Sequence, residues 1–509
     1  MPPEGRDTDD RRGSGLDGDS APARAGSGAP LAHAGRLAEN TSAKRPASTA
    51  LAASDAPFGV DTPPADSRPS LSSRIRAVGS LSWPLVAGSA VSLLTAVADT
   101  AILGQYDTLE LAVMARAVVI FVFCTAVLVP WGMAVQIVGA QWHGGEETGR
   151  LVRLLTHSAA LTLGLGLVLA VGLYLAAPWV LQITGASASA SAEQAAIEVL
   201  RILTLAIPAA ALSAAARGWL GAQGRTKVAL ANAAVVNLAN IAISLALVFG
   251  LQQGAQGAAW GTTIAHYLGL AVCLGLALRH RRGLEVTQES GTEPVLRPLG
   301  KVAWPDVVFG LGAYGGDVLI VAAVAFLGAV ELAGYRVMAS TVAILFTVAF
   351  TCGSGISILV GQRHGAGDLR AGLDYARAGA IVMGGCVAVL ALPALVVPGW
   401  YLRLFTTDAA VIESIGRALL VFWLIAPLIV ASISMAAVVR AVGDTKSMMY
   451  IGLLAQVAIA LPAAWLLGVW LELGLLGIAL AMTLSWFSRT VLTAWRLRST
   501  TARLLQQRT

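Results

Sequence analysis

Long apolar runs alternate with short polar segments along most of this chain. From about Leu81 to Trp495, Gly, Pro and charged residues separate runs that are each long enough to form a membrane-spanning helix. A bilayer core about 30 Å thick needs about 20 helical residues to cross it. The pattern therefore predicts an all-α polytopic membrane protein with twelve transmembrane helices, at residues 81–104, 112–140, 151–177, 195–217, 228–250, 257–279, 302–327, 333–361, 371–398, 414–439, 447–469 and 474–497.

The N-terminal segment, residues 1–75, follows a different pattern. It is rich in Gly, Ser, Ala, Pro, Asp and Arg, and it contains almost no aromatic or β-branched residues. Such a segment buries too little apolar surface to offset its ordering entropy. We expect a disordered cytoplasmic extension at 1–75, and the remaining organisation to be an N-terminal six-helix bundle at 78–280, a cytoplasmic linker at 281–301, a C-terminal six-helix bundle at 302–498 and a cytoplasmic tail at 499–509.

Basic residues concentrate in alternate loops. The segments after even-numbered spans carry Lys and Arg, as at 150–153, 225–227 and 279–301, whereas the loop at 105–111 and the stretch at 186–193 have none. Positive loops face the cytoplasm, so both termini are expected there, in a multi-pass protein of the cell membrane. The net charge of +6 then needs no nucleic-acid partner. We expect a monomer that meets small-molecule substrates and membrane lipid.

The two halves repeat each other. Trp83-Pro84 recurs as Trp304-Pro305, VGAQWHGG at 138–145 recurs as VGQRHGAG at 360–367, and GRTK at 224–227 recurs as GDTK at 443–446. Nearly the same offset in residue number relates the members of each pair. Six spans per repeat is an even number, so the repeats are parallel, as in secondary transporters whose substrate cavity lies between the halves.

Asp99 lies deep in the first apolar run. A carboxylate at the centre of a span costs roughly 2.5–3.5 kcal/mol on insertion scales, and such residues usually work in a cavity. Removal from water disfavours the charged form, so this group suits the uptake and release of a proton. The alternative is a structural acid paired with Asn, Thr or Arg.

Further polar residues lie in the fifth to seventh spans. Asn237, Asn240 and Ser244 are spaced i, i+3 and i+7, so they share one helical face. They could rearrange their hydrogen bonds when Asp99 changes charge, or they could join helices structurally. Asp317, which is deep in the seventh span, forms a second candidate cation or substrate site together with Tyr267 and His266, with structural pairing as the alternative. Asp306 lies too near the end of its span to indicate chemistry.

Several classes of site are missing from the sequence. There is no P-loop motif for ATP and no HExxH or paired-cysteine metal motif. The four cysteines lie far apart inside apolar runs, as small packing residues do. We therefore expect no metal, no cofactor and no enzymatic activity.

The motifs together resemble one transporter family. The segments VADTAILGQYDTLELA (97–112), VGAQWHGG (138–145) and the stretch from Gly218 to Thr263 look like the multidrug and toxic compound extrusion (MATE) family, in particular its DinF-like branch. The resemblance covers about residues 78–498. It implies a cation-coupled antiporter built of two six-helix bundles around a central cavity that opens to alternate sides.

The resemblance also implies roles for individual residues. Asp99 matches the first-span acid that the DinF-like branch uses for proton coupling, Asn237 and Asn240 match asparagines in the family pattern N-x-x-N-I-x-x-D, and Thr262 matches a nearby threonine. The family pattern ends in Asp where this chain has Ser244, so the two-carboxylate site is reduced to one. The function expected is export of organic, often cationic, compounds in exchange for H⁺, with Na⁺ as the second choice.

Two other functions stay open on the sequence alone. A lipid-linked oligosaccharide flippase of the same superfamily would need a basic cavity, and the spans offer few Lys or Arg residues. An integral membrane transferase would usually need acidic metal-binding clusters in an aqueous loop, and the one acid-dense short motif, DTDD at 7–10, lies in the N-terminal extension.

Overall fold

The structure is a computed structural model that describes residues 69–183, 189–284 and 294–506. All of these residues belong to one compact unit, residues 53–509, and none of them forms a β-strand. The expected extension up to residue 68, the middle of the expected linker and the last three residues lie outside the described residues. The first helix begins at Leu71, where the Ser70 side chain accepts a hydrogen bond from the Ser73 N–H.

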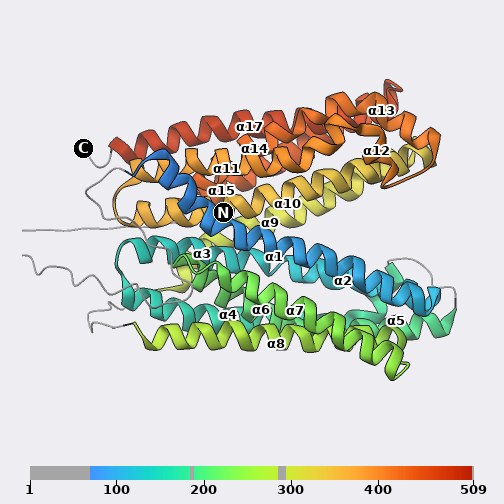
Figure 1. The fold of residues 1–509 in the computed structure, drawn as a ribbon, viewed down its shortest axis with the longest axis horizontal. Helices are drawn as coiled ribbons and strands as arrows, with labels where there is room; N and C mark the ends of the chain where they lie inside the picture. Colours follow the sequence, from blue (N-terminus) through green and yellow to red (C-terminus); the bar gives the residue numbers. More distant parts are fainter. Residues whose placement is uncertain (1–68, 184–188, 285–293, 507–509) are drawn as a thin grey trace, which may run out of the picture. The chain divides into compact units, whose positions relative to one another are not determined.

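The N-terminal half forms eight helices and one π-helical turn (Figure 1). In chain order they are α1 (Leu71–Tyr106), α2 (Thr108–Ala126), α3 (Val129–Gly144), α4 (Thr148–Ile183), α5 (Ala190–Thr204), α6 (Ala206–Ala222), α7 (Lys227–Leu245), η2 (Ala246–Gly250) and α8 (Gly254–Arg282). Each span expected in this half falls within one helix or two consecutive helical elements. This group, α1 to α8, is called the N-terminal bundle below.

The C-terminal half repeats that order. Its elements are α9 (Leu296–Ala325), α10 (Ala329–Gly365), α11 (Leu369–Val396), α12 (Pro398–Arg403), α13 (Ala409–Trp423), α14 (Ile425–Ala441), α15 (Thr445–Leu453), η3 (Leu454–Ala460), α16 (Leu461–Ala463), η4 (Ala464–Trp470) and α17 (Gly474–Gln506). They are called the C-terminal bundle below.

The span count agrees with the sequence. Within the described residues, eleven helices are long and apolar enough to cross a membrane. The remaining expected span, 414–439, corresponds to α13 and α14, which meet at Leu424. The prediction of an all-α fold with twelve membrane helices is therefore confirmed.

The interruptions within spans repeat as well. α5 and α6 meet at Leu205, and α13 and α14 meet at the repeat-related Leu424. In both cases a proline, Pro208 or Pro427, follows three positions on. Proline lacks the N–H that would continue the hydrogen-bond ladder, and its ring clashes with the carbonyl one turn earlier. The same local chemistry therefore breaks the same span in both halves.

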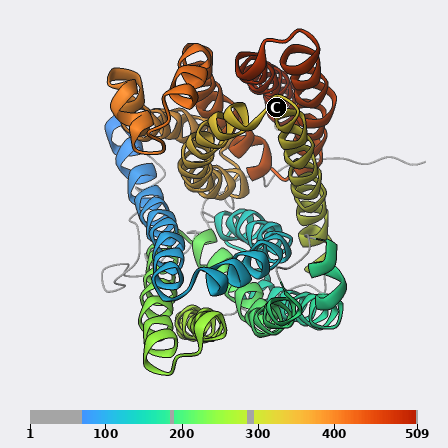
Figure 2. The same cartoon turned by 90° about the vertical axis from the view of Figure 1, so that its right-hand side faces the viewer.

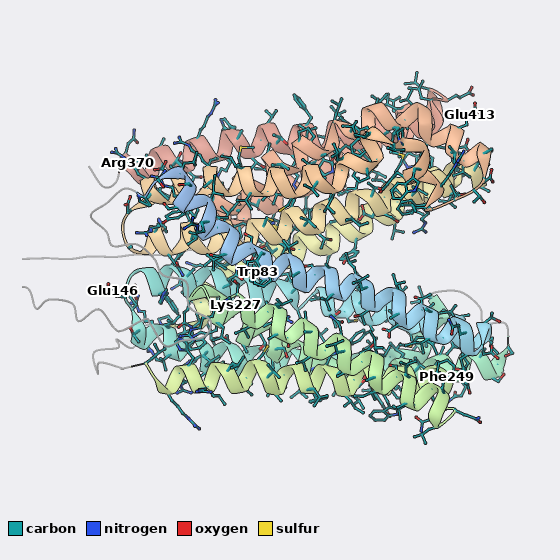
Figure 3. All side chains as sticks on the ribbon, in the orientation of Figure 1. Trp83, Glu146, Lys227, Phe249, Arg370 and Glu413 are labelled. Atoms are coloured by element: carbon teal, nitrogen blue, oxygen red, sulfur yellow. The ribbon has the colours of Figure 1, made fainter. Side chains whose placement is uncertain are left out.

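The helices define two ends of the molecule. Figure 3 labels Glu146 and Arg370 at one end, called the basic end below, with Lys227 on the same side but further in, and Phe249 and Glu413 toward the opposite end. Both α1 and α9 start at the basic end, and the ribbons of the two bundles diverge toward the opposite end (Figure 1).

The N-terminal parts of α1 and α9 cross between the bundles. Val78 and Leu81 of α1 are buried in the apolar core of the C-terminal bundle. Leu299 and Val302, at the repeat-related positions of α9, are buried in a core of the N-terminal bundle. In Figure 2 these two helices lie on opposite sides, each along the seam between the bundles. The early part of each of these two helices thus packs in the core of the other bundle.

Candidate functional site

The placement of Asp99 follows from the register between α1 and α7. These helices run in the same direction, and a Cβ atom at Gly88 would lie 3.4 Å from the Cβ of Ala233. One turn further, the Asn237 Nδ2 donates to the Ser92 Oγ at 3.3 Å. Both pairs have the same separation in the sequence, so the two helices pack in a fixed register.

That register continues to Asp99. Gly88, Ser92 and Asp99 are spaced i, i+4 and i+11, which places them on one face of α1. Two turns beyond the Ser92–Asn237 pair, Asp99 is level with Ser244. Further along α1, the Tyr106 hydroxyl donates to the Gln252 carbonyl at 3.2 Å. The two residues of this pair are one residue further apart in the sequence than those of the Ser92–Asn237 pair. The π-helical turn η2 lies between and accounts for the added residue.

Several oxygen atoms near the level of Asp99 and Ser244 have no hydrogen-bond partner. The Asn240 Nδ2 donates to the Thr262 Oγ1 at 2.9 Å, which in turn donates to the Ala258 carbonyl at 3.1 Å. Within the described part of the chain, the Asp99 Oδ1, the Asn240 Oδ1 and the Ser244 Oγ are buried and accept or donate no hydrogen bond. Ser244 is fully buried.

We call Asp99, Asn237, Asn240, Ser244 and Thr262 the coupling site. These residues lie on α1, α7 and α8, three helices that pack against one another. Buried polar atoms are normally hydrogen-bonded, so the three unpaired oxygens of Asp99 on α1 and of Asn240 and Ser244 on α7 leave this part of the protein chemically incomplete. A proton on the carboxyl group would supply a donor to a neighbouring oxygen, and a monovalent cation would be held by the same oxygens.

Tyr267 and His266 lie next to this site on α8 but have other contacts. The Tyr267 hydroxyl donates to the Leu205 carbonyl at 3.1 Å, at the break between α5 and α6. The His266 Nδ1 lies 2.8 Å from the Thr262 carbonyl, and its ring contacts the edge of Phe121. The hydrogen bond of Tyr267 joins α8 to the break between α5 and α6. The contact of His266 is with Thr262, a residue of the coupling site.

Asp317 lies in the other bundle. Its carboxyl oxygen accepts a hydrogen bond of 2.9 Å from the Gln456 Nε2, and the side chain is exposed. Tyr314, one turn earlier on the same face of α9, contacts the ring of Phe123 in the N-terminal bundle. Asp317 therefore faces the space between the bundles. No contact among the described residues joins it to Tyr267 or His266, the residues grouped with it in the expected second site.

The repeated motifs VGAQWHGG and VGQRHGAG meet at the basic end. The Gln141 Nε2 donates to the Ala441 carbonyl at 2.6 Å, and the Gln362 Nε2 donates to the Ala222 carbonyl at 2.8 Å. Each glutamine thus satisfies a carbonyl at the last turn of a helix in the other bundle, where the helix itself leaves carbonyls unpaired.

Glycine allows this close approach. A Cβ atom at Gly144 would overlap the backbone carbonyl of Gln362, and one at Gly365 would overlap the carbonyl of Gln141. The two contacts are related by the repeat, because Gly144 corresponds to Gly365 and Gln141 to Gln362. We call these four residues the inter-bundle clamp. The sequence identifies the motifs as repeat markers, and only the structure shows that they touch.

Charged residues that the sequence did not single out lie near the clamp. Arg440 forms an ion pair of 3.3 Å with Asp306. The sequence alone does not indicate a function for this acid, because it lies near the end of its span. Arg489 of α17 lines the same pocket as Arg440. The sequence does contain an indication that Arg489 is functionally important. This arginine falls well inside the twelfth expected span, and arginines at that depth in a span are rare.

Comparison with known proteins places the chain in a family. The MatE family profile matches residues 84–246 and 312–466. The "Probable multidrug resistance protein NorM" of Pseudomonas syringae pv. tomato is 27% identical over 454 residues, which cover 84% of this chain and 95% of that protein. The "DNA damage-inducible protein F" of Escherichia coli is 27% identical over 372 residues, or 70% and 78%.

Solved structures show the same fold at low identity. A multidrug resistance MATE family transporter of the MOP superfamily, in an outward-facing conformation, superposes with a TM-score of 0.76 at 17% identity and covers 85% of this chain and 97% of that one. A MOP superfamily transporter from Pyrococcus furiosus gives 0.74 at 16% identity, covering 86% and 97%. With two matched segments that together span more than half of the sequence, the chain belongs to the MatE family of multidrug efflux transporters.

Proposed function

We propose that this protein is a secondary active antiporter that exports organic, often cationic, compounds in exchange for protons by alternating access. The observation that carries the proposal is the Asp99 carboxyl group, whose Oδ1 is buried without a hydrogen-bond partner at the level of α7 where Asn240 and Ser244 also carry unpaired oxygens. Protonation would remove a charge from a region shielded from water and provide a hydrogen-bond donor to one of those oxygens. The occupied and empty states of the site would therefore favour different packing of α1 against α7.

α1 can transmit that difference. Asp99 packs in the N-terminal bundle, whereas Val78 and Leu81 at the start of the same helix are buried in the C-terminal bundle. Pro84 lies between them, inside the helix, where it removes a backbone hydrogen bond and permits bending. A change at Asp99 would thus act on the contact between the bundles through one continuous helix.

The inter-bundle clamp would be one of the two gates. If the basic loops face the cytoplasm, as the positive-inside rule predicts, the clamp would close the cytoplasmic face of the bundle pair. Export would require a second state in which the clamp opens and the opposite ends approach. The protein would act as a monomer in the cell membrane, because each copy contains both bundles.

A proton is the preferred coupling ion over Na⁺. The coupling site contains one carboxyl group, because Ser244 stands where the family pattern has an aspartate, and a single carboxyl group suffices to carry one proton. The unpaired oxygens of Asn240 and Ser244 would also suit Na⁺, so the ion has to be tested directly.

Transport by purified protein in liposomes, with pH and Na⁺ gradients imposed separately, tests the proposal. A pH gradient alone should drive uptake of a cationic dye, and Asp99→Asn should abolish it while leaving reconstitution and thermal stability unchanged. Asp408→Asn is the matched control, because it neutralises an exposed acid of the other bundle outside both candidate sites, and asparagine can still accept the hydrogen bond from the Ala410 N–H. Transport driven by Na⁺ alone, or retained in Asp99→Asn, would contradict proton coupling at this site.

Of the two alternatives left open by the sequence, family membership excludes the transferase, since the family consists of transporters. The scarcity of basic residues in the spans disfavours the flippase. The structure weakens this argument against the flippase, because arginines line two of its pockets. The family match still favours export of small molecules.

A further inference from the structure

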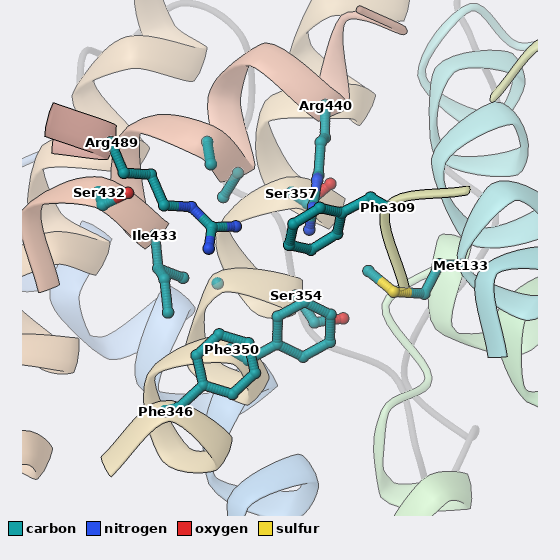
Figure 4. Close-up of a pocket in the computed structure, with 13 residues that line it drawn as sticks. Met133, Phe309, Phe346, Phe350, Ser354, Ser357, Ser432, Ile433, Arg440 and Arg489 are labelled. Carbon is teal, nitrogen blue, oxygen red and sulfur yellow. The ribbon is translucent and has the colours of Figure 1, made fainter. Parts of the chain in front are cut away.

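A pocket in the C-terminal bundle, separate from the coupling site, contains two arginines (Figure 4). It is formed by α9, α10, α14 and α17, with Met133 of α3 on one side. Arg440 comes from α14 and Arg489 from α17, and Figure 4 shows both guanidinium groups directed toward the ring of Phe309. The carbon at the centre of the Arg489 guanidinium lies 4.9 Å from the centre of that ring.

Positive charges outnumber negative charges at this pocket. Asp306 is buried and pairs with Arg440 at 3.3 Å. Arg489 has no hydrogen bond or ion pair within the described residues, and its contacts are with the faces of Phe309 and Trp486. Two guanidinium groups thus share one carboxylate, which leaves one positive charge without a partner inside a membrane protein. Arginines in such places usually pair with an acid or act on a ligand.

Further donors surround the unpaired charge. Among the described residues, the Ser357 Oγ, the Ser432 Oγ and the Arg440 Nε are buried without a hydrogen-bond partner, and both serines line the pocket. Guanidinium and hydroxyl groups together match the oxygens of a carboxylate, which accept several hydrogen bonds at once. The rest of the lining is apolar and aromatic, including Phe346 and Phe350.

We propose that this pocket binds an organic monoanion whose carboxylate meets Arg489 and the serine hydroxyls, and whose flat apolar part lies against the phenylalanine rings. One unpaired guanidinium calls for one negative charge, so a monocarboxylate fits better than a phosphate or pyrophosphate dianion. The proposal goes beyond the coupling mechanism, because the pocket lies in the bundle that does not contain Asp99. It also differs in sign from the cationic compounds expected as exported substrates.

Binding of benzoate to the detergent-purified full chain, measured by titration calorimetry at constant ionic strength, tests this proposal. Benzoate should bind saturably, whereas benzamide, which has the same shape but no charge, and inorganic pyrophosphate should not. Arg489→Gln should weaken benzoate binding by about tenfold or more, since it removes a charged hydrogen-bond donor. Arg363→Gln is the matched control, because Arg363 also stacks on an aromatic ring, that of Tyr375, but lies outside the pocket.

A variant with the opposite expected effect separates recognition from damage to the fold. Asp306→Asn removes the carboxylate that competes for the arginines, so it should tighten benzoate binding severalfold, whereas a general loss of structure would weaken it. The proposal is overturned if benzamide binds as well as benzoate, if pyrophosphate binds and benzoate does not, or if Asp306→Asn weakens binding. Benzoate binding should also persist in Asp99→Asn, so failure of proton coupling and failure of this site are distinguishable.

Discussion

Substitution of Gly365 by alanine should open the basic end of the molecule. The added Cβ atom would overlap the backbone carbonyl of Gln141, and neither atom can yield by changing a side-chain rotamer, so α3 and α10 must separate by more than an ångström. The hydrogen bonds of Gln141 and Gln362, at 2.6 and 2.8 Å, would then exceed bonding distance.

The structure sets the size of this effect. Each lost hydrogen bond contributes about 0.5–1.5 kcal/mol, so the two together contribute about 1–3 kcal/mol. A difference of that size shifts a two-state equilibrium by roughly 5- to 150-fold. The clamped state would therefore be less populated, and transport should slow if the clamp is the cytoplasmic gate that we propose.

Spin labels at Lys227 and Lys446 provide the measurement. Both side chains are exposed at the basic end, one in each bundle and at repeat-related positions. In a background lacking the four native cysteines, Gly365→Ala should lengthen the distance distribution between labels at Lys227→Cys and Lys446→Cys. Gly300→Ala, at a helical glycine with open space around it, is the control. An unchanged distribution in Gly365→Ala would refute the assignment of the clamp as a gate.

Three further outcomes are expected. Ser244→Asp places a second carboxyl group level with Asp99, so the number of protons exchanged per substrate, measured by flux coupling in liposomes, should rise from one to two; an unchanged ratio would argue against the register. Tyr267→Phe should leave transport intact and lower the free energy of unfolding by about 1 kcal/mol, because it loses only the hydrogen bond to Leu205; abolished transport would make Tyr267 part of the site. Trp219→Ala should destabilise the protein by about 3–5 kcal/mol, since the indole is fully buried; a denaturant titration that shows almost no loss of stability would contradict its place in the core.

Much of the fold follows from local sequence. Apolar run length sets the number of spans, because a bilayer of fixed thickness requires helices of a fixed minimum length. Breaks at Leu205 and Leu424 follow from the prolines three positions later. The spacing of Asn237, Asn240 and Ser244 places them on one helical face, whatever that face contacts.

Some charged residues stand out from the sequence for a physical reason, and others do not. An acid deep in an apolar run is costly, so Asp99 stands out from the sequence alone. Asp306 does not stand out, because an acid near the end of a span can reach water. Its importance depends on Arg440, which lies in a span far along the chain, and no local pattern reports such a pair.

By itself, then, the sequence determined how many times the chain crosses the membrane, that it does so as two parallel repeats, and that an acid as deep in a span as Asp99 is expensive to bury. The tertiary structure decided which of these segments touch. It brought Asp99 level with Ser244, made contacts of the repeated Gln-and-Gly motifs, and directed Arg440 and Arg489 into one pocket. The reason is that helix periodicity and span length are properties of neighbouring residues, whereas register between helices and the balance of buried charge arise only when distant segments pack together.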